Sequence, residues 1–395
     1  MMRIGRTLPP AAAPLGAIDM VYGVAGAIRR RRAIASLEAD LTRAFHVRHV
    51  FTMSSGTAAL VVTLTALKSL SPRREVVIPA FTCFSVAAAV VRAGLRPVLC
   101  DVDADTFDFD QTRLGETVSR RTLCVIAHHL FGIPAAIQAT RRTCEREGAF
   151  LVEDAAQAMG VEAGGRRLGT IGDAGIFSFG RGKSVTCGSG GVVMTNSPQI
   201  AAAIARVHAG VASPSRVDEI REFAAAVLMA VFIRPSLYWI PAALPFLGLG
   251  RTVYPARIAV NRLSGVQAGL LRRWRRRLAG SNEARAAAAS YFVRRLALHP
   301  AAGAPHPYLR LPVLASDADA RARVCEQSRK RGLGVSMAYP TPINEIPEIA
   351  AAFGEQRFPS ARRLSERLLT LPTHHWLSDR DKRAIADLCR DVAAA

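Results

Sequence analysis

Two stretches carry the clearest structural signal in this chain of 395 residues: AFLVEDAAQ at residues 149–157 and AGIFSFGRGK at residues 174–183. Each begins as a short apolar run typical of a buried strand and then turns polar. Similar runs lie at residues 75–79, 96–101, 122–127 and 191–195. Strands separated by helical stretches form βαβ units, so the pattern predicts an α/β fold with a mainly parallel sheet. Polar residues at the ends of such strands are candidates for a functional site.

The remaining chain divides into a long first part and a shorter second part. The spacing of apolar residues predicts helices at residues 33–50, 58–67 and 82–92 in the first part. From about residue 280 we expect one long helix, one strand and two more helices, at residues 281–298, 309–314, 317–331 and 360–369. The sequence therefore predicts a large domain over residues 1–280 and a smaller α+β domain over residues 281–395.

The charge of the chain is strongly positive and comes almost entirely from arginine. The formal net charge is +21, and of the 52 cationic residues only four are lysines: Lys68, Lys183, Lys330 and Lys382. Residues 211–300 alone hold 14 basic and 4 acidic side chains. Such an excess favours a polyanionic partner, a membrane surface or an acidic substrate. Nucleic acid is not the expected partner, because no helix-turn-helix, zinc-finger or RNA-binding signature accompanies the charge.

Cysteine usage and the N-terminal stretch indicate the compartment. The seven cysteines include no CxxC pair, so we expect neither a zinc site nor any other metal. The apolar N-terminal stretch contains prolines and Asp19 and ends at Arg29–Arg32, which does not fit a signal peptide. We expect the protein in the reducing cytoplasm.

Four polar elements together have the chemistry that one cofactor needs. Ser54–Thr57 precedes a predicted helix, where it could cradle a phosphate or only cap the helix. Glu153 and Asp154 close a strand, where a carboxylate could hold a protonated ring nitrogen or cap a β–α junction. Lys183 lies in a Gly-rich loop, and a partly buried lysine forms an imine with an aldehyde. The glycine loop 188–191 permits a tight turn or is structural only. An anion site, a carboxylate and a lysine in this order indicate pyridoxal 5′-phosphate (PLP).

At these residues the chain resembles the DegT/DnrJ/EryC1/StrS family of PLP-dependent sugar aminotransferases. The matching motifs keep their order and spacing over most of the chain apart from roughly residues 212–258. They include SGTAAL (55–60), VIPAFT (77–82), HHLFGIPA (128–135), VEDAAQAMG (152–160), GTIGDAGIFSFGRGK (169–183) and RLSGVQAGLL (262–271). The resemblance implies a PLP-dependent transferase of fold type I, in which helices sandwich a mainly parallel seven-stranded sheet. It also implies a homodimer with shared active sites.

The resemblance further implies roles for single residues. Lys183 would form the internal aldimine and carry the proton between the two reacting carbons. Asp154 would keep the ring nitrogen protonated, and Gln157 would lie near the ring. The cofactor phosphate would be held by Ser55, Gly56, Thr57 and Ser178, and by Arg262 from the neighbouring subunit.

Two positions depart from the family pattern. Cys83 stands where an aromatic ring usually stacks on the cofactor, and Phe81 or Phe84 is a candidate to compensate. Ser189 replaces an acid that is usual in the glycine loop. Because Lys183 is present, the family branch that carries histidine there and performs dehydration is disfavoured.

Residues 212–258 are an apolar insertion with two interpretations. The runs 223–233 and 237–250 are each shorter than the ~20 residues that a spanning helix needs. They could form a hairpin on the inner face of the cytoplasmic membrane, with the arginines and Trp274 of residues 270–278 at an anionic interface. The other interpretation is a dimer interface or a cover for the substrate, with the arginines on a solvated helix face.

The expected function is transfer of an amino group from glutamate or glutamine to a keto group of a sugar, expected to be nucleotide-linked. Such a step belongs to the biosynthesis of cell-surface polysaccharides or secondary metabolites. Arginine suits a diphosphate substrate because its guanidinium pairs with phosphate through two hydrogen bonds, although a cyclitol ketone fits as well. The alternative is a PLP-binding regulatory or scaffolding protein without turnover, for which Cys83 and Ser189 are the only support.

Overall fold

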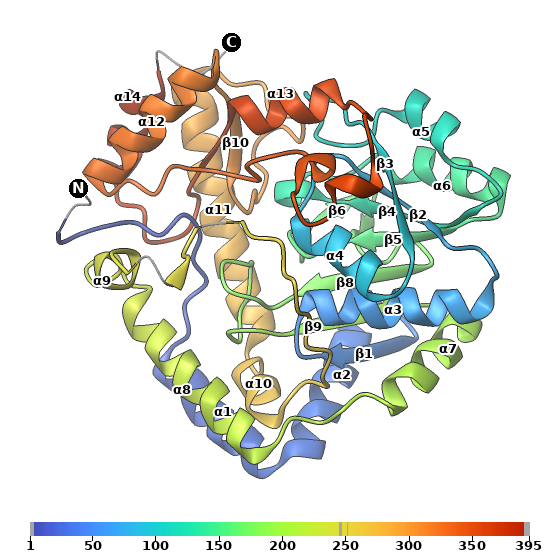
Figure 1. The fold of residues 1–395 in the computed structure, drawn as a ribbon. Coiled ribbons are helices and arrows are strands. Elements are labelled where there is room, and N and C mark those ends of the chain that lie inside the picture. The colour runs from blue at the N-terminus through green and yellow to red at the C-terminus, as the bar shows by residue number, and fades with distance from the viewer. Residues whose placement is uncertain (1–3, 245–246, 251, 391–395) are drawn as a thin grey trace.

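A seven-stranded sheet forms the centre of the computed structural model, which describes residues 4–244, 247–250 and 252–390 (Figure 1). The strand order is β1-β9-β8-β5-β4-β2-β3. The strands are β1 (His49–Met53), β2 (Glu75–Pro79), β3 (Arg96–Cys100), β4 (Thr122–His128), β5 (Phe150–Asp154), β8 (Ala174–Ser178) and β9 (Gly191–Thr195). In this order, the neighbouring strands β8, β5, β4, β2 and β3 pair in parallel. Strand β9 runs antiparallel to both β8 and β1. The predicted α/β fold with a mainly parallel sheet is confirmed.

Strand β1 is an element that the sequence pattern did not predict. The helix expected at residues 33–50 is α2 (Arg30–Phe45), and it ends where His46 adopts a left-handed conformation. Residues 49–53 then pair with β9 along their whole length. The helix predicted over residues 33–50 was therefore wrong for His49 and Val50, because the apolar spacing of a short segment fits both periods and only its distant partner decides between them.

Helices cover both faces of the sheet, and alternate strand residues belong to different cores. On β2, Val76 and Ile78 pack into one hydrophobic cluster and Val77 into the other, as the two-residue period of a strand requires. The first face is covered by α3 (Gly56–Leu70), α4 (Phe84–Arg92) and α7 (Pro198–Ala209). The second is covered by α2, α5 (Gln111–Thr117), α6 (Ile137–Glu147) and α10 (Gly265–Leu270). The predicted sandwich of sheet and helices is confirmed.

The C-terminal region is a small antiparallel sheet with its own helices, at the upper left of Figure 1. Its strand order is β10-β12-β11, with β10 at Leu311–Leu314, β12 at Leu368–Leu371 and β11 at Ser336–Met337. The helices are α11 (Trp274–Leu296), α12 (Ala318–Arg331), α13 (Pro359–Arg367) and α14 (Asp379–Cys389). Helix α11 begins before residue 281 and crosses the expected domain boundary. The division into two domains stays a prediction.

The N-terminal helix α1 (Ala17–Ile28) packs against α10 so closely that only glycine fits at the contact. A Cβ atom on Gly26 would lie 2.2 Å from the carbonyl oxygen of Gly265. A Cβ atom on Gly269 would lie 2.0 Å from the carbonyl oxygen of Tyr22. These neighbours are backbone atoms, which cannot rotate away as a side chain can.

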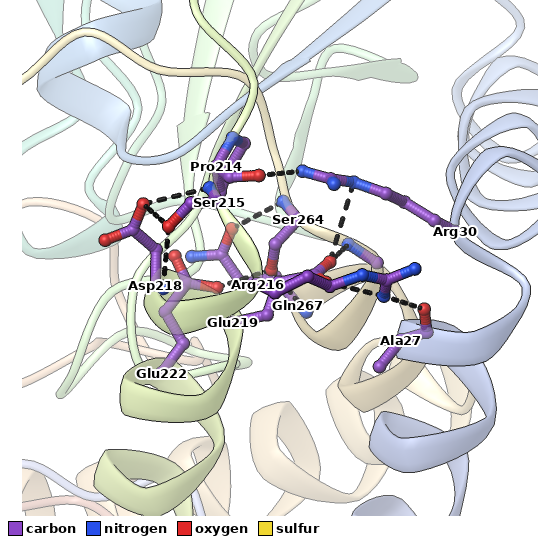
Figure 2. Close-up of polar contacts among 11 residues, drawn as sticks. Ala27, Arg30, Pro214, Ser215, Arg216, Asp218, Glu219, Glu222, Ser264 and Gln267 are labelled. Atoms are coloured by element: carbon purple, nitrogen blue, oxygen red, sulfur yellow. Dashed lines mark hydrogen bonds and ion pairs between the residues drawn. The ribbon is translucent and has the colours of Figure 1, made fainter.

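The apolar insertion begins with α8 (Arg216–Phe232), and two acidic side chains attach this helix to α10 (Figure 2). Glu219 is buried and accepts hydrogen bonds from the Gly265 N–H at 3.0 Å and from Arg216 Nη1 at 3.1 Å. One turn later, Glu222 accepts a hydrogen bond from Ser264 Oγ at 2.5 Å. The polar end of α8 is therefore fixed to the same helix that α1 contacts.

Helices α8 and α1 lie side by side (Figure 1), and each carries exposed apolar side chains. We call this surface the apolar face, and it consists of Ile18, Val21, Val24 and Ile28 on α1 and Val217, Ile220, Val227, Leu228 and Val231 on α8. The insertion continues through α9 (Trp239–Ala242), and its positions 245, 246 and 251 lie outside the described residues. Among the residues that the structure describes, no helix is long and apolar enough to cross a membrane.

The prediction that Trp274 lies at a membrane interface is wrong. Its side chain is 3% exposed, and its Nε1–H donates a hydrogen bond to Asp40 Oδ2 at 2.8 Å. Its ring stacks on Phe45 with 5.9 Å between centroids. Helical spacing turns Trp274 and Arg277 inward and leaves Arg272 and Arg276 exposed, so only part of residues 270–278 faces outward.

The glycine contact between α1 and α10 predicts a large loss of stability for Gly269→Ala. The added methyl group would overlap a backbone oxygen, which should lower the free energy of unfolding by about 2–3 kcal/mol. The control is Gly280→Ala in α11, where a Cβ atom meets nothing within 4 Å, and this change should raise stability by about 0.5–1 kcal/mol. Urea denaturation measures both. Equal midpoints for the two variants would contradict the close contact.

Candidate active site

The predicted site residues meet at one edge of the sheet because of how its last strands pair. Parallel pairing places the ends of β5 and β8, at Asp154 and Ser178, at the same edge. Strand β9 begins there, where Gly191 pairs with Ser178 on one side and with Met53 at the end of β1 on the other. Helix α3 follows β1 almost directly, so Ser55–Thr57 lies beside Ser178.

The beginning of α3 forms an anion cradle. Ser55 caps the helix, since its Oγ accepts the N–H of Ala58 at 3.0 Å, so the simple capping role is real. The N–H groups of Gly56 and Thr57 have no acceptor within the helix and carry its positive dipole end, which suits a phosphate. A Cβ atom at Gly56 would lie 2.8 Å from the Cβ of Ser178, so glycine permits this close approach. The donors and the space fit the phosphate of PLP.

Glu153 and Asp154 are neighbours on β5 and serve different tasks, because successive side chains of a strand point to opposite faces. Glu153 is buried, and its carboxylate accepts three backbone N–H groups of the loop 169–172 at 2.5–2.9 Å. His129 Nε2 donates a fourth hydrogen bond to it at 3.0 Å. Burial favours a higher pKa for Glu153, but the hydrogen bonds hold that pKa below its usual value. Glu153 is therefore a structural anchor.

Asp154 and Lys183 are the two titratable groups of the site that interact with each other. Within the described chain, Asp154 accepts one hydrogen bond, from the Ala156 N–H at 3.1 Å, which leaves lone pairs for a ligand. Burial raises the pKa of Asp154, and the charge of Lys183 opposes this shift. Burial lowers the pKa of Lys183, with Cys83 and Asp154 opposing. A lowered pKa leaves more of the amine unprotonated and able to attack an aldehyde.

Gln157 connects two residues that the sequence analysis did not single out, Phe131 and Tyr339. Its Oε1 accepts the Phe131 N–H at 3.1 Å, and its Nε2 donates to the Tyr339 hydroxyl at 3.0 Å. Phe131 and Tyr339 both have a positive φ, at 57° and 43°, and such strain concentrates at functional sites. Burial raises the pKa of Tyr339, so its hydroxyl stays protonated at neutral pH. Tyr339 comes from the C-terminal region, and no local motif marks it.

Cys83 precedes α4 and lies close enough to Lys183 for the two groups to interact electrostatically, with its Sγ 3.0 Å from Ser85 Oγ. Phe81 and Phe84 are buried in the core, so neither presents a free face to replace the missing aromatic ring. Phe81 instead contacts the ring of Tyr339 edge-on, with 5.5 Å between centroids.

Arg262 and Ser189 flank the cradle and bond to their own chain. Arg262 donates from Nε and Nη2 to the carbonyl oxygens of residues 208 and 209 at 2.9–3.2 Å. Ser189 Oγ donates to the carbonyl oxygen of Ser54 at 2.6 Å, which attaches the glycine loop to the cradle. The contact of Arg262 with a neighbouring active site stays a prediction.

Comparisons with known proteins agree with this geometry. The chain is 32% identical to GDP-perosamine synthase from Vibrio cholerae over 42% of this chain and 46% of that protein. It is 27% identical to UDP-N-acetyl-3-dehydro-α-D-glucosamine 3-aminotransferase from Acidithiobacillus ferrooxidans over 90% of this chain and 87% of that protein. The chain spans about half the length of the first two curated relatives that it matches.

The fold matches solved structures over nearly the whole chain. One is Helicobacter pylori PseC, an aminotransferase involved in the biosynthesis of pseudoaminic acid, with a TM-score of 0.78 and 17% identity. The match covers 97% of this chain and 98% of that one. The model of the DegT/DnrJ/EryC1/StrS aminotransferase family matches residues 24–390, which confirms the resemblance and with it the predicted fold type and cofactor, PLP. The chain therefore belongs to the DegT/DnrJ/EryC1/StrS aminotransferase family.

Proposed function

We propose that this protein transfers an amino group from glutamate or glutamine to the keto group of a nucleotide-linked sugar. The observation that carries the proposal is that Asp154 and Lys183, which interact electrostatically, lie at the edge of the sheet where α3 begins with its free N–H groups. Two relatives support the substrate class, because one is named for a GDP-linked sugar and the other for a UDP-linked sugar.

In this proposal each site residue has one task. PLP, when bound, supplies a carbonyl carbon that binds amines and a ring that accepts electrons. Lys183 holds the cofactor through its amine and, once displaced, moves a proton between the two reacting carbons. Asp154 keeps a proton on the ring nitrogen. The cradle of Ser55, Gly56, Thr57 and Ser178 binds the phosphate. Gln157, held in place by Phe131 and Tyr339, lies against the ring.

We also propose that two copies share their active sites, with Arg262 of one copy reaching the phosphate in the other. Two of the nitrogens of this guanidinium are used on its own chain, and Nη1 is the nitrogen without a hydrogen bond among the described residues. The main chain of Arg262 pairs with Met53, which directly precedes the cradle at the start of α3. This position beside the cradle supports the proposed role of Arg262.

A further part of the proposal is that the apolar face rests on an anionic membrane surface. Exposed arginines lie at its ends: Arg29, Arg31 and Arg32 after α1, and Arg216, Arg221 and Arg234 on and after α8. An apolar patch bordered by arginines suits acidic lipid headgroups. The membrane contact would then involve α1 and α8 rather than Trp274, and we place it at the inner face of the cytoplasmic membrane.

The proposed reaction predicts a donor half-reaction that can be followed by light absorption. With L-glutamate or L-glutamine, the visible absorption band of the bound cofactor should disappear as the amino group passes to it. Lys183→Ala should lack the wild-type band from the start. If no amino donor changes the wild-type spectrum, the protein is a PLP-binding regulator without turnover and the proposed function is wrong.

The different tasks of Glu153 and Asp154 predict opposite phenotypes. Glu153→Gln brings an NH₂ group against backbone N–H donors, so the free energy of unfolding should fall by about 3 kcal/mol. Because the pKa of Glu153 is lowered in the folded protein, its contribution to the free energy of unfolding is present above its unfolded pKa and is lost as pH falls through its folded pKa. The free energy of unfolding of Glu153→Gln should therefore decrease less than that of the wild type as the pH falls.

Asp154→Asn keeps the acceptor for Ala156, so its stability should change by less than about 1 kcal/mol while the donor half-reaction slows by roughly a hundredfold or more. Urea denaturation between pH 4 and pH 7, together with the donor half-reaction, separates the two variants. An Asp154→Asn protein that reacts at the wild-type rate would contradict the assigned role.

The proposed membrane contact predicts vesicle flotation that depends on the apolar face. Wild-type protein should float with vesicles containing phosphatidylglycerol and not with phosphatidylcholine alone. The double variant Ile220→Glu, Leu228→Glu should lose at least about tenfold in binding. Val91→Glu places the same change at an exposed apolar residue of α4 and should bind like the wild type. If the double variant instead changes the mass in light scattering and neither protein floats, the face is a contact between protein copies.

A further inference from the structure

One arginine in the active site has no acidic partner. Arg310 directly precedes β10 and is partly buried, and its Nη1 donates a hydrogen bond to Ser336 Oγ at 3.3 Å. Among the described residues it makes no ion pair, in a chain where many arginines do. A desolvated guanidinium without a counter-ion is costly unless a ligand supplies the negative charge.

The main chain places Arg310 at the active site. The N–H of Leu309, its neighbour, donates to the carbonyl oxygen of Phe131 at 2.8 Å. Phe131 in turn donates its N–H to Gln157, and Gln157 bonds the hydroxyl of Tyr339. The charge of Arg310 acts on Lys183 and lowers its pKa, a smaller effect than those of burial, Cys83 and Asp154. The guanidinium therefore lies close enough to the reactive amine for the two charges to interact.

Two other arginines near the site donate hydrogen bonds to their own chain. Arg285 also lies beside Lys183, but it is completely buried and donates to the carbonyl oxygens of Ala12 and Lys183. Arg262 is bound to its own chain on the far side, beside the cradle. Of these three arginines, Arg310 is the one that combines partial access with a lack of strong acceptors.

From this placement we infer that Arg310 binds the α-carboxylate of the amino donor and selects α-amino acids over simple amines. A guanidinium matches a carboxylate through two parallel hydrogen bonds. In an α-amino acid the carboxylate is bonded to the same carbon as the amine, so it must lie within a few ångströms of the atom that reacts at Lys183. The diphosphate of a sugar nucleotide is separated from the keto carbon by the sugar ring and belongs further out. The inference rests on the proposed aminotransferase function.

The test compares Arg310→Met and Arg310→Lys with Arg323→Met, which removes an exposed arginine of α12. In the donor half-reaction, Arg310→Met should raise the L-glutamate concentration that gives half the maximal rate by roughly 10- to 100-fold, and L-glutamine should be affected equally. Arg310→Lys, which keeps the charge but not the paired donors, should lie in between. Isobutylamine, which has no carboxylate, should react equally with wild type and variants.

A second readout does not depend on turnover. Removing a positive charge near the Lys183 nitrogen should raise the pH midpoint of the visible cofactor band in Arg310→Met and leave it unchanged in Arg310→Lys. Succinate, an unreactive carboxylate, should raise the midpoint of the wild type and not that of Arg310→Met. The inference is overturned if Arg310→Met behaves like Arg323→Met in both measurements. If the wild type reacts with no donor, the proposed function fails, while the response to succinate still reports on Arg310.

Discussion

The buried carboxylate of Glu153 is the interaction on which the site most depends. It holds the loop 169–172 and the ring of His129, two segments that come from either side of β5 in the sequence. Because these bonds fix the end of β5, the next side chain, Asp154, must point to the opposite face, toward Lys183. The carboxylate of Glu153, which has no proposed part in the reaction, thus determines the position of the Asp154 carboxylate.

The sequence was sufficient for the parts of the site that come from local patterns. Asp154 and Ser178 were found because each lies at the end of a predicted strand. Lys183 was found because it is the one of only four lysines that lies in the Gly-rich loop after such a strand. Sequence alone left open which of Glu153 and Asp154 faces the cavity, since that depends on hydrogen-bond partners up to nineteen residues away.

The features that sequence reasoning missed depend on distant contacts. Strand β1 is stabilised by pairing with β9, far along the chain, and the apolar run at residues 49–53 fits a helix equally well. Trp274 was expected outside because arginines surround it, yet helical spacing buries it against Phe45 and Asp40. Tyr339 and Arg310 enter the site from the C-terminal region, and nothing in their own neighbourhoods marks them.

The glycine contact between α1 and α10 also constrains how the protein is made. Helix α1 leaves the ribosome long before α10, but the surface that fits Gly26 and Tyr22 is formed by residues 265–270. Until most of the chain has been synthesised, both the inner and the outer side of α1 remain without a partner. Long-range contacts of this kind form late, and the exposed apolar helix is meanwhile a binding site for chaperones and a starting point for aggregation.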